Sequence, residues 1–342
     1  MPGGASACDF GALAQWVEAS NGTVGAVRPA RFGLAQLPPD LTERGLAATT
    51  ATPAGSTLFS VPESLILSTR NNSALAPLLA GADPPLSTHA TLALLLLLEL
   101  RKANTSRYAP YLACLPVTGA RVGDEEGETS SAAWSESQLS ELQASHAAIA
   151  ARRLHSQLHA EYSLLFPRAC RAVPALCSGT AADLPPSERL YRRARLLVQS
   201  RAVRLPSRVP PSGAPSPPAP LALVPLLDLI NHAPASTGRA STWHVDKRGA
   251  LSVRSGCALG AGEEILISYG DHSSAALLLR FGFVPRARTP ADAVALRLPP
   301  LPPPAASASA TPQAFTRVRA RLLAPVPHPP PLSTSPAPLG DS

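Results

Sequence analysis

The 342-residue sequence lacks an apolar run long enough to cross a membrane. Its longest run, Ala90 to Leu98, is roughly half of the ~20 residues that a bilayer-spanning helix needs, and charged residues follow it directly. A buried helix is therefore the better interpretation. The first residues, Met1 to Gly11, also lack the basic start and apolar centre of a secretory signal and the Arg- and Ser-rich composition of a transit peptide. We expect a protein of the cytoplasm or nucleus without a membrane partner.

A cysteine framework is missing as well. The five cysteines form neither a C-x-x-C pair nor an even pattern, and they are Cys8, Cys114, Cys170, Cys177 and Cys257. Such spacing predicts neither disulfides nor a structural zinc site, and it fits a reducing compartment. His155 and His159 have the spacing of a zinc-binding pair on one helix face, but no glutamate and third ligand stand beside them as in a metalloprotease. We interpret them as a surface pair and predict no metal.

Charge is present, but it selects no partner. The net charge of +7 comes largely from arginines in two segments, Arg189 to Arg208 and Arg280 to Arg288. These segments could bind an acidic partner or nucleic acid, or they could be solvated helix faces. The solvated face is the more common case, so we expect a monomer without a nucleic-acid partner.

The chain alternates between β-prone and helical segments, which predicts an α+β protein without internal repeats. Short strands and turns are expected early in the chain, helices in its middle, and strands again after a proline-rich stretch. Proline, with 39 residues, marks this stretch and a tail with little to bury, which we expect to be disordered. The predicted boundaries are 10–87, 88–205, 206–220, 221–290 and 291–342.

Several helix ends can be predicted. We expect a helix over Glu136 to Leu165 with Ser135 as its N-cap, and another over Ser187 to Val203. The acidic stretch from Gly123 to Glu128 separates the first from the leucine-rich helix before it. A short last helix should run from Ser274 to Arg280 and end in a left-handed cap at Gly282.

Two motifs place polar side chains in apolar, β-prone surroundings. Asn231 and His232 end the run Leu227-Asp228-Leu229-Ile230-Asn231-His232, and Tyr269 ends the later run that starts at Gly262-Glu263-Glu264. A buried amide, imidazole or phenol needs a partner or a ligand. We therefore predict a catalytic pocket built from Asn231, His232 and Tyr269.

The order of the motifs resembles the SET-domain methyltransferases, and more narrowly the Rubisco large-subunit methyltransferase-like branch. The matching pieces cover roughly residues 10 to 290 and are Glu43-Arg44-Gly45-Leu46, Val61-Pro62, Tyr111 to Leu115-Pro116, Trp134-Ser135-Glu136, Ser200-Arg201, Asp228 to His232, Gly262 to Gly270 and Phe281-Gly282-Phe283-Val284. The resemblance implies a pseudoknot-like SET fold of short strands, with halves at 10–87 and 221–290 split by a helical insertion at 88–205.

The resemblance also implies an activity: methyl transfer from S-adenosyl-L-methionine to a lysine of a non-histone protein. Tyr269 falls on the position of the catalytic tyrosine. The implied cofactor-binding residues are Glu43, Arg44, Arg201, Asn231, His232 (mainly through its backbone) and Phe283. The implied substrate-site residues are Ser200, Asp228, Trp243 and Phe281.

Each residue also has a purely structural interpretation. Tyr269 could be a half-buried core residue with its hydroxyl in water, and Asn231 with His232 could be a satisfied turn. Asp228 could cap a turn or form a salt bridge with Arg201. A degenerate, non-catalytic SET-fold module that binds peptides is the alternative function.

The sequence departs from the family pattern mostly on the substrate side. Glu43 replaces the first glycine of the usual turn, Ser274 stands where asparagine is common, and Trp243 lies where a pocket tyrosine can occur. Phe281 replaces a common tyrosine, and the lost phenol predicts room for a more methylated product. The proline-rich tail stands where the family has a C-terminal helical substrate-binding domain. We therefore expect either substrate presentation by the insertion alone or a truncated product.

Overall fold

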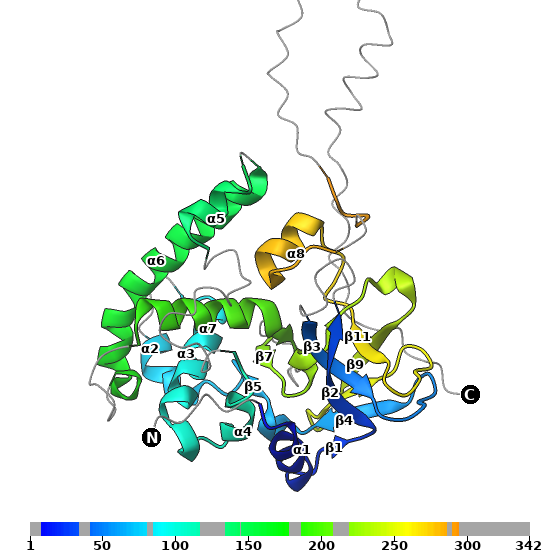
Figure 1. The fold of residues 1–342 in the computed structure, drawn as a ribbon. Coiled ribbons are helices and arrows are strands. Elements are labelled where there is room, and N and C mark those ends of the chain that lie inside the picture. The colour runs from blue at the N-terminus through cyan, green and yellow to red at the C-terminus, as the bar shows by residue number, and fades with distance from the viewer. Residues whose placement is uncertain are drawn as a thin grey trace, which may run out of the picture. The chain divides into compact units, whose positions relative to one another are not determined.

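The computed structural model describes residues 8–33, 42–80, 85–116, 134–143, 145–177, 186–207, 219–285 and 289–293. Within the unit Met1–Ala293, helices and strands occupy different sides, so the protein is a mixed α+β fold, as expected (Figure 1). The predicted tail at 291–342 and the acidic stretch at 123–128 lie outside the described residues, apart from 291–293.

The larger sheet has eight strands among the described residues, in the order β1-β4-β10-β9-β11-β3-β2, and β8 pairs with β11. Its strands are β1 Thr23–Val24, β2 Val27–Gly33, β3 Thr42–Ala48, β4 Thr57–Val61, β8 Asn231–His232, β9 Ala240–Val245, β10 Leu251–Arg254 and β11 Glu264–Ile267. β10 alternates buried apolar residues with more exposed ones, which is the pattern of a half-covered strand, whereas β4 buries the adjacent residues Leu58 and Phe59. β11 lies between β3 and β9, so strands distant in sequence meet at its sides.

A smaller sheet and a group of helices form the other side of the unit. The sheet has the order β5-β7-β6, with β5 Leu67–Ser68, β6 Val203–Arg204 and β7 Leu221–Leu223. The helices between β5 and β6 are α2 Ala76–Ala80, α3 Thr88–Arg101, α4 Ala109–Leu112, α5 Glu136–Ser140, α6 His146–Ala172 and α7 Glu188–Arg201. α3 packs against α7 and the small sheet, so this sheet joins the helices to the strands.

The leucine run is a buried helix, as predicted. α3 is buried continuously from Ala90 to Leu98, and Ser87 caps its start by accepting a hydrogen bond from the Ala90 N–H. A helix that is apolar on all sides must be surrounded by other elements. No helix of the described residues is long and apolar enough to cross a membrane.

Capping residues set most helix boundaries. Ser187 caps α7, and Ser273 caps α8 (Ser274–Phe281), which ends at Gly282 with φ +84°, as predicted. The prediction of a single helix from Glu136 to Leu165 was wrong. Ser135 starts only the short helix α5, and Ser145 caps a separate helix α6. The helix-favouring composition between them concealed the second cap.

The prediction of no disulfides was also wrong. Cys8 is bonded to Cys114, and Cys170 to Cys177, while Cys257 is free. Cys8 lies just before α1 (Phe10–Ala19), and α1 packs against α4, which precedes Cys114. A sequence separation of 106 residues gives no sign of this proximity, because only the fold brings the two segments together.

Candidate active site

The parallel pairing of β8 with β11 brings the two polar motifs together. Asn231 lies opposite Leu266, and His232 lies opposite Ile267. Parallel strands end at the same edge of a sheet, so Tyr269, just after β11, lies beside β8. The structure thus places Asn231, His232 and Tyr269 at one edge of the sheet. The segment before β8 consists of β7 and a 3-10 turn, Leu227–Leu229.

Asn231 ties three strands together. Its Nδ2 donates to the carbonyl oxygen of Arg44 at 3.1 Å and to Oε1 of Glu264 at 2.8 Å. These bonds connect β8 to β3 and to β11. A Cβ atom at Gly45 would lie 2.8 Å from Glu264 Oε1 and 2.9 Å from Asn231 Nδ2. Glycine at position 45 therefore leaves the room that the Asn231 amide occupies.

Both ends of Tyr269 are held by the segment around β8. Its hydroxyl donates to the carbonyl oxygen of Ile230 at 2.7 Å, and its backbone N–H donates to His232 Nδ1 at 3.1 Å. The ring itself is half-buried. The structural interpretation that left the hydroxyl in water therefore does not hold. The ring has a fixed position and still keeps an accessible face.

Aromatic side chains surround Tyr269. Its ring centroid lies 4.8 Å from that of Phe281, 5.1 Å from that of His232 and 6.4 Å, edge-on, from that of Phe283. His232 and Phe283 are 6.0 Å apart. α8 and its glycine cap supply the two phenylalanines, so the last helix completes the wall. Such a wall disfavours a charged group placed against it.

The His232 side chain has a role that the sequence did not indicate. We expected mainly backbone contacts, but Nδ1 accepts the Tyr269 N–H, which requires the ring to be unprotonated at Nδ1. Burial lowers the pKa of His232 below its ordinary value of 6.5, and nearby His272 lowers it further. The neutral imidazole is therefore the form that holds Tyr269.

A buried carboxylate lies behind this edge. Asp228 is buried, and its Oδ2 accepts the Tyr111 hydroxyl at 2.8 Å, while Oδ1 has no hydrogen-bond partner among the described residues. Burial raises the pKa of Asp228, and the Arg201 cation opposes this rise. Arg201 Nη1 donates to the backbone carbonyl of Asp228. The cap or salt bridge that we considered is thus replaced by a Tyr111 bond to the carboxylate and an Arg201 bond to the backbone.

Tyr111 was quoted for the motif but not predicted as a site residue. It lies in α4, far from Asp228 in sequence, and is fully buried. The turn before Asp228 is also unusual, because Leu226 has φ +67°. A non-glycine residue in this region is strained by about 1–2 kcal/mol, and such strain gathers at functional sites.

The other predicted residues have separate positions. Ser200 Oγ donates to Leu197 O of its own helix α7 at 3.3 Å. Trp243 lies in β9 opposite Val253 and packs against the core. Glu43 pairs with Phe32 through the β2–β3 ladder, and its side chain is outside the described set. None of the described contacts brings these three side chains to Tyr269.

The histidine pair considered for zinc is used within the helices. His159 Nδ1 lies 3.0 Å from Glu188 Oε1, and His155 Nε2 lies 2.7 Å from Arg192 Nη2. Both partners belong to α7, so the pair connects α6 to α7. In the described residues, no three His, Cys, Asp or Glu side chains form a group that could hold a metal ion.

Comparison with solved structures decides the fold. This chain is similar to the crystal structure of the SET domain of LSMT bound to MeLysine and AdoHcy. The TM-score is 0.60 and the identity 22%, over 80% of this chain and 56% of that one. Rubisco LSMT bound to AdoMet matches with a TM-score of 0.58, 21% identity and the same coverage. The chain has the fold of a SET domain.

Curated proteins agree with this assignment. The SET-domain chain is 28% identical to SET domain-containing protein 4 of Mus musculus over 264 residues, which is 74% of this chain and 55% of that protein. It is 29% identical over 266 residues to the actin-histidine N-methyltransferase of Drosophila melanogaster, which is 74% of this chain and 46% of that protein. The chain thus spans about half the length of these relatives. No family model matches it. The resemblance to SET-domain protein methyltransferases is confirmed.

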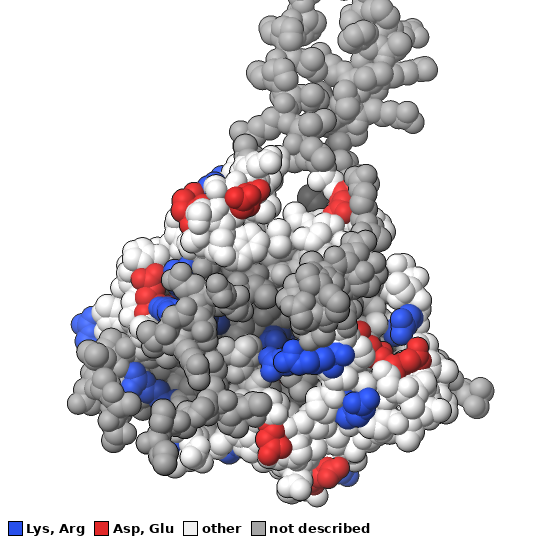
Figure 2. All heavy atoms as spheres, in the orientation of Figure 1, with Lys and Arg blue, Asp and Glu red and all other residues white. Residues whose placement is uncertain are grey.

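Charge on the surface of the SET-domain chain is mixed. On the face drawn in Figure 2, the described Lys and Arg side chains lie in separate groups among acidic and uncharged ones. Interspersed charges of both signs are typical of a solvated surface, whereas nucleic-acid binding needs a continuous basic one. This face therefore has the mixed charge of a solvated surface.

Proposed function

We propose that this chain is an S-adenosyl-L-methionine-dependent protein methyltransferase that acts on a lysine of a non-histone protein. The observation that carries the proposal is the position of Tyr269, held at its hydroxyl by Ile230 and at its backbone by His232 within an aromatic wall. The two hydrogen bonds hold the ring and the hydroxyl in one position, as a residue that aligns a reacting group requires.

The residues at the strand edge have the chemistry that the cofactor needs. Arg201 uses Nη1 on the Asp228 carbonyl and has further guanidinium donors for a carboxylate. Asn231 and the Arg44 carbonyl lie together at the crossing of β8 and β3, and Phe283 provides an aromatic surface beside His232. Bound S-adenosyl-L-methionine supplies an electrophilic methyl group on a sulfonium centre. The proposed cofactor-binding residues are Arg44, Arg201, Asn231, His232 and Phe283, with Glu43 contributing through its backbone.

The aromatic wall accounts for the second requirement of the reaction. A lysine amine attacks only as the neutral form, because the ammonium has no lone pair. Phe281, Phe283 and Tyr269 disfavour the charged form through desolvation. The Tyr269 hydroxyl donates a hydrogen bond to Ile230 O, and a hydroxyl oxygen held in this way can accept weak C–H···O contacts from a methyl group.

The acceptor residue is proposed by analogy with solved and curated relatives. One solved LSMT SET domain is bound to lysine, whereas one curated relative is named for an actin histidine. We propose lysine, with Asp228, Ser200, Trp243 and Phe281 on the substrate side. The degenerate peptide-binding module is the competing function, favoured by Phe281 and Glu43, which depart from the family pattern.

The test combines cofactor binding with transfer. The purified chain is incubated with methyl-labelled S-adenosyl-L-methionine and a cell extract, and labelled residues are identified by mass spectrometry. We expect labelled lysine with the natural chain and none with Asn231→Ala, which should also lose cofactor affinity in calorimetry. Cofactor binding without any labelled protein would support the peptide-binding module, and labelled histidine would overturn the lysine assignment.

A further inference from the structure

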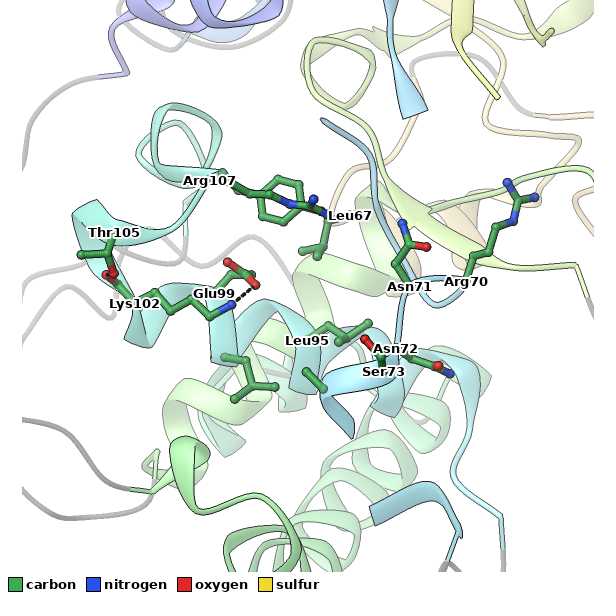
Figure 3. Close-up of a pocket in the computed structure, with 13 residues that line it drawn as sticks. Leu67, Arg70, Asn71, Asn72, Ser73, Leu95, Glu99, Lys102, Thr105 and Arg107 are labelled. Carbon is green, nitrogen blue, oxygen red and sulfur yellow. Dashed lines mark hydrogen bonds and ion pairs between the residues drawn. The ribbon is translucent and has the colours of Figure 1, made fainter. Parts of the chain in front are cut away.

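A cavity lies on the helical side of the unit (Figure 3). It has a volume of about 820 Å³, and three segments line it: the loop after β5, the last turns of α3, and the segment after the 3-10 turn Ala103–Thr105. Its lining shares no residue with the aromatic wall around Tyr269. The cavity is therefore built from other residues than the strand edge.

The lining carries more positive than negative charge. Arg70, Lys102 and Arg107 line the cavity, with Glu99 as the one carboxylate among the lining residues that the structure describes. Arg70 is bound to Glu63 at 2.8 Å and to the Pro206 carbonyl at 3.0 Å. These contacts fix the Arg70 guanidinium in place at one side.

Both carboxylate oxygens of Glu99 already accept hydrogen bonds from neighbouring residues. Its Oε1 accepts from Lys102 Nζ at 2.6 Å, and its Oε2 accepts from Ser106 Oγ at 2.6 Å. Arg107 instead lies with its Cζ 4.6 Å above the ring of Tyr108 and donates to that hydroxyl. Within the described chain, Arg107 has no carboxylate partner. Its charge is thus available to an incoming anion.

The remaining lining groups suit a peptide. Figure 3 shows Asn71, Asn72 and Ser73 across the cavity from Thr105 and Lys102. Asn72 does not use its side chain to cap the 3-10 turn that follows it, and Asn71 and Ser73 are exposed. Leu67, Leu95 and Leu98, together with Tyr108, add apolar surface. Amides that bond to a peptide backbone, cations for carboxylates and an apolar floor match an acidic segment with an apolar residue.

The floor of the cavity is connected to the substrate side of the active site. Tyr108 is the N-cap residue of α4, and Tyr111 in the same helix holds the Asp228 carboxylate. Leu67 pairs with Leu223 of β7, the strand that leads into the Asp228 turn. An occupant of the cavity would therefore contact the elements that support Asp228.

We propose that this cavity docks an acidic segment of the protein substrate. Naming the occupant as substrate rests on the proposed function, whereas the preference for an acidic peptide rests on the cavity alone. The probe is a short fluorescein-labelled peptide of glutamate and leucine residues, compared with a peptide in which glutamine replaces glutamate. Fluorescence anisotropy is measured at low and at physiological salt, because exposed charge pairs weaken as salt screens them.

We expect the natural chain to bind the glutamate peptide and not the glutamine peptide. Arg107→Glu should weaken binding by about tenfold or more, since it places a like charge against the ligand. Lys102→Gln tests the same cavity with a milder change at an exposed side chain. Lys247→Glu is the matched control, because it makes the same charge change at an exposed position just after β9. This control should bind like the natural chain.

Two readouts separate this proposal from the methyltransferase proposal. Calorimetric binding of S-adenosyl-L-methionine reports on the active site, and it should be unchanged in Arg107→Glu. If Arg107→Glu and Lys102→Gln both bind the glutamate peptide as well as the natural chain does, the docking proposal is wrong. If the natural chain binds the peptide as expected but no cofactor, the docking site stands and the methyltransferase proposal falls. Competition by the glutamate peptide against protein labelling, lost in Arg107→Glu, would support the occupant being a substrate.

Discussion

The backbone N–H of Tyr269 donates to Nδ1 of His232 across 3.1 Å, while the two rings lie 5.1 Å apart. His232 thereby fixes the backbone of Tyr269 through Nδ1, which must be unprotonated to accept this hydrogen bond. The position of the proposed catalytic tyrosine consequently depends on the charge state of its neighbour.

This dependence predicts a loss of activity and stability in acid. Burial holds the pKa of His232 below its ordinary 6.5, with His272 adding to the effect and Asp271 opposing it. As the pH falls through about 6.5, the unfolded chain takes up the proton first. Stability is therefore complete above this pH and is lost as the pH falls toward the folded-state pKa.

The variant His232→Asn should lose less of its turnover rate in acid than the natural chain does. Its amide oxygen can accept the Tyr269 N–H, and it does not titrate. His232→Leu should lower the rate at every pH, since it has no acceptor. A pH profile of the turnover rate distinguishes them. An unchanged acid limb in His232→Asn would show that His232 does not position Tyr269.

A second prediction concerns the bond between Tyr111 and Asp228. Tyr111→Phe leaves both carboxylate oxygens of a buried aspartate without a hydrogen bond, and this should cost about 1–3 kcal/mol of unfolding free energy. Tyr162→Phe is the matched control, because the Tyr162 hydroxyl also bonds at 3.0 Å, to the Pro186 carbonyl, but at a less buried position. Urea denaturation measures both. Equal losses would contradict a special role for the Asp228 contact.

The third prediction tests the room left by Gly45. Gly45→Ala places a Cβ at 2.8 Å from Glu264 Oε1 and 2.9 Å from Asn231 Nδ2, so the bonds of Asn231 must shift. We expect a loss of about 1–3 kcal/mol in stability, as in other over-packed positions, and weaker cofactor binding. At Gly260 the nearest atom would be 3.5 Å away, so Gly260→Ala should be close to neutral. Equal stability and equal cofactor affinity of the two variants would contradict the claim that a Cβ at position 45 displaces Asn231.

Much of this edge could be predicted from the sequence, for identifiable reasons. Asn231, His232 and Tyr269 lie in two short motifs with a characteristic order, and the cap residues Ser273 and Gly282 are local signals that do not depend on the rest of the fold. These features were therefore predictable without coordinates.

The missed features depend on contacts between distant segments. Tyr111 reaches Asp228 across 117 positions, and Cys8 reaches Cys114 across 106, so no periodic pattern marks either pair. The packing of Trp243, which lies in β9 opposite Val253 and against the core, likewise depends on residues distant in sequence. The His232 side chain was overlooked because its partner is a backbone N–H, which no residue type reveals.

The fourth prediction concerns the degree of methylation. Phe281 lies 4.8 Å from Tyr269 between ring centroids, and Phe281→Tyr adds a hydroxyl to this wall. The added group fills space and can bond to the amine, so we expect a shift toward fewer methyl groups per acceptor. Mass spectrometry of the labelled protein measures the product states. Monomethylation alone from both the natural chain and Phe281→Tyr would show that Phe281 does not set the product.

The most direct measurement of the central claim is methyl transfer by Tyr269→Phe at saturating S-adenosyl-L-methionine, with cofactor affinity measured on the same sample. The variant keeps the ring and the N–H bond to His232 but loses the hydroxyl. We predict cofactor affinity within a factor of about three and a turnover rate lower by about 100-fold or more, because only the aligned transition state is affected. A turnover rate equal to that of the natural chain would contradict the assignment of Tyr269 as the catalytic residue.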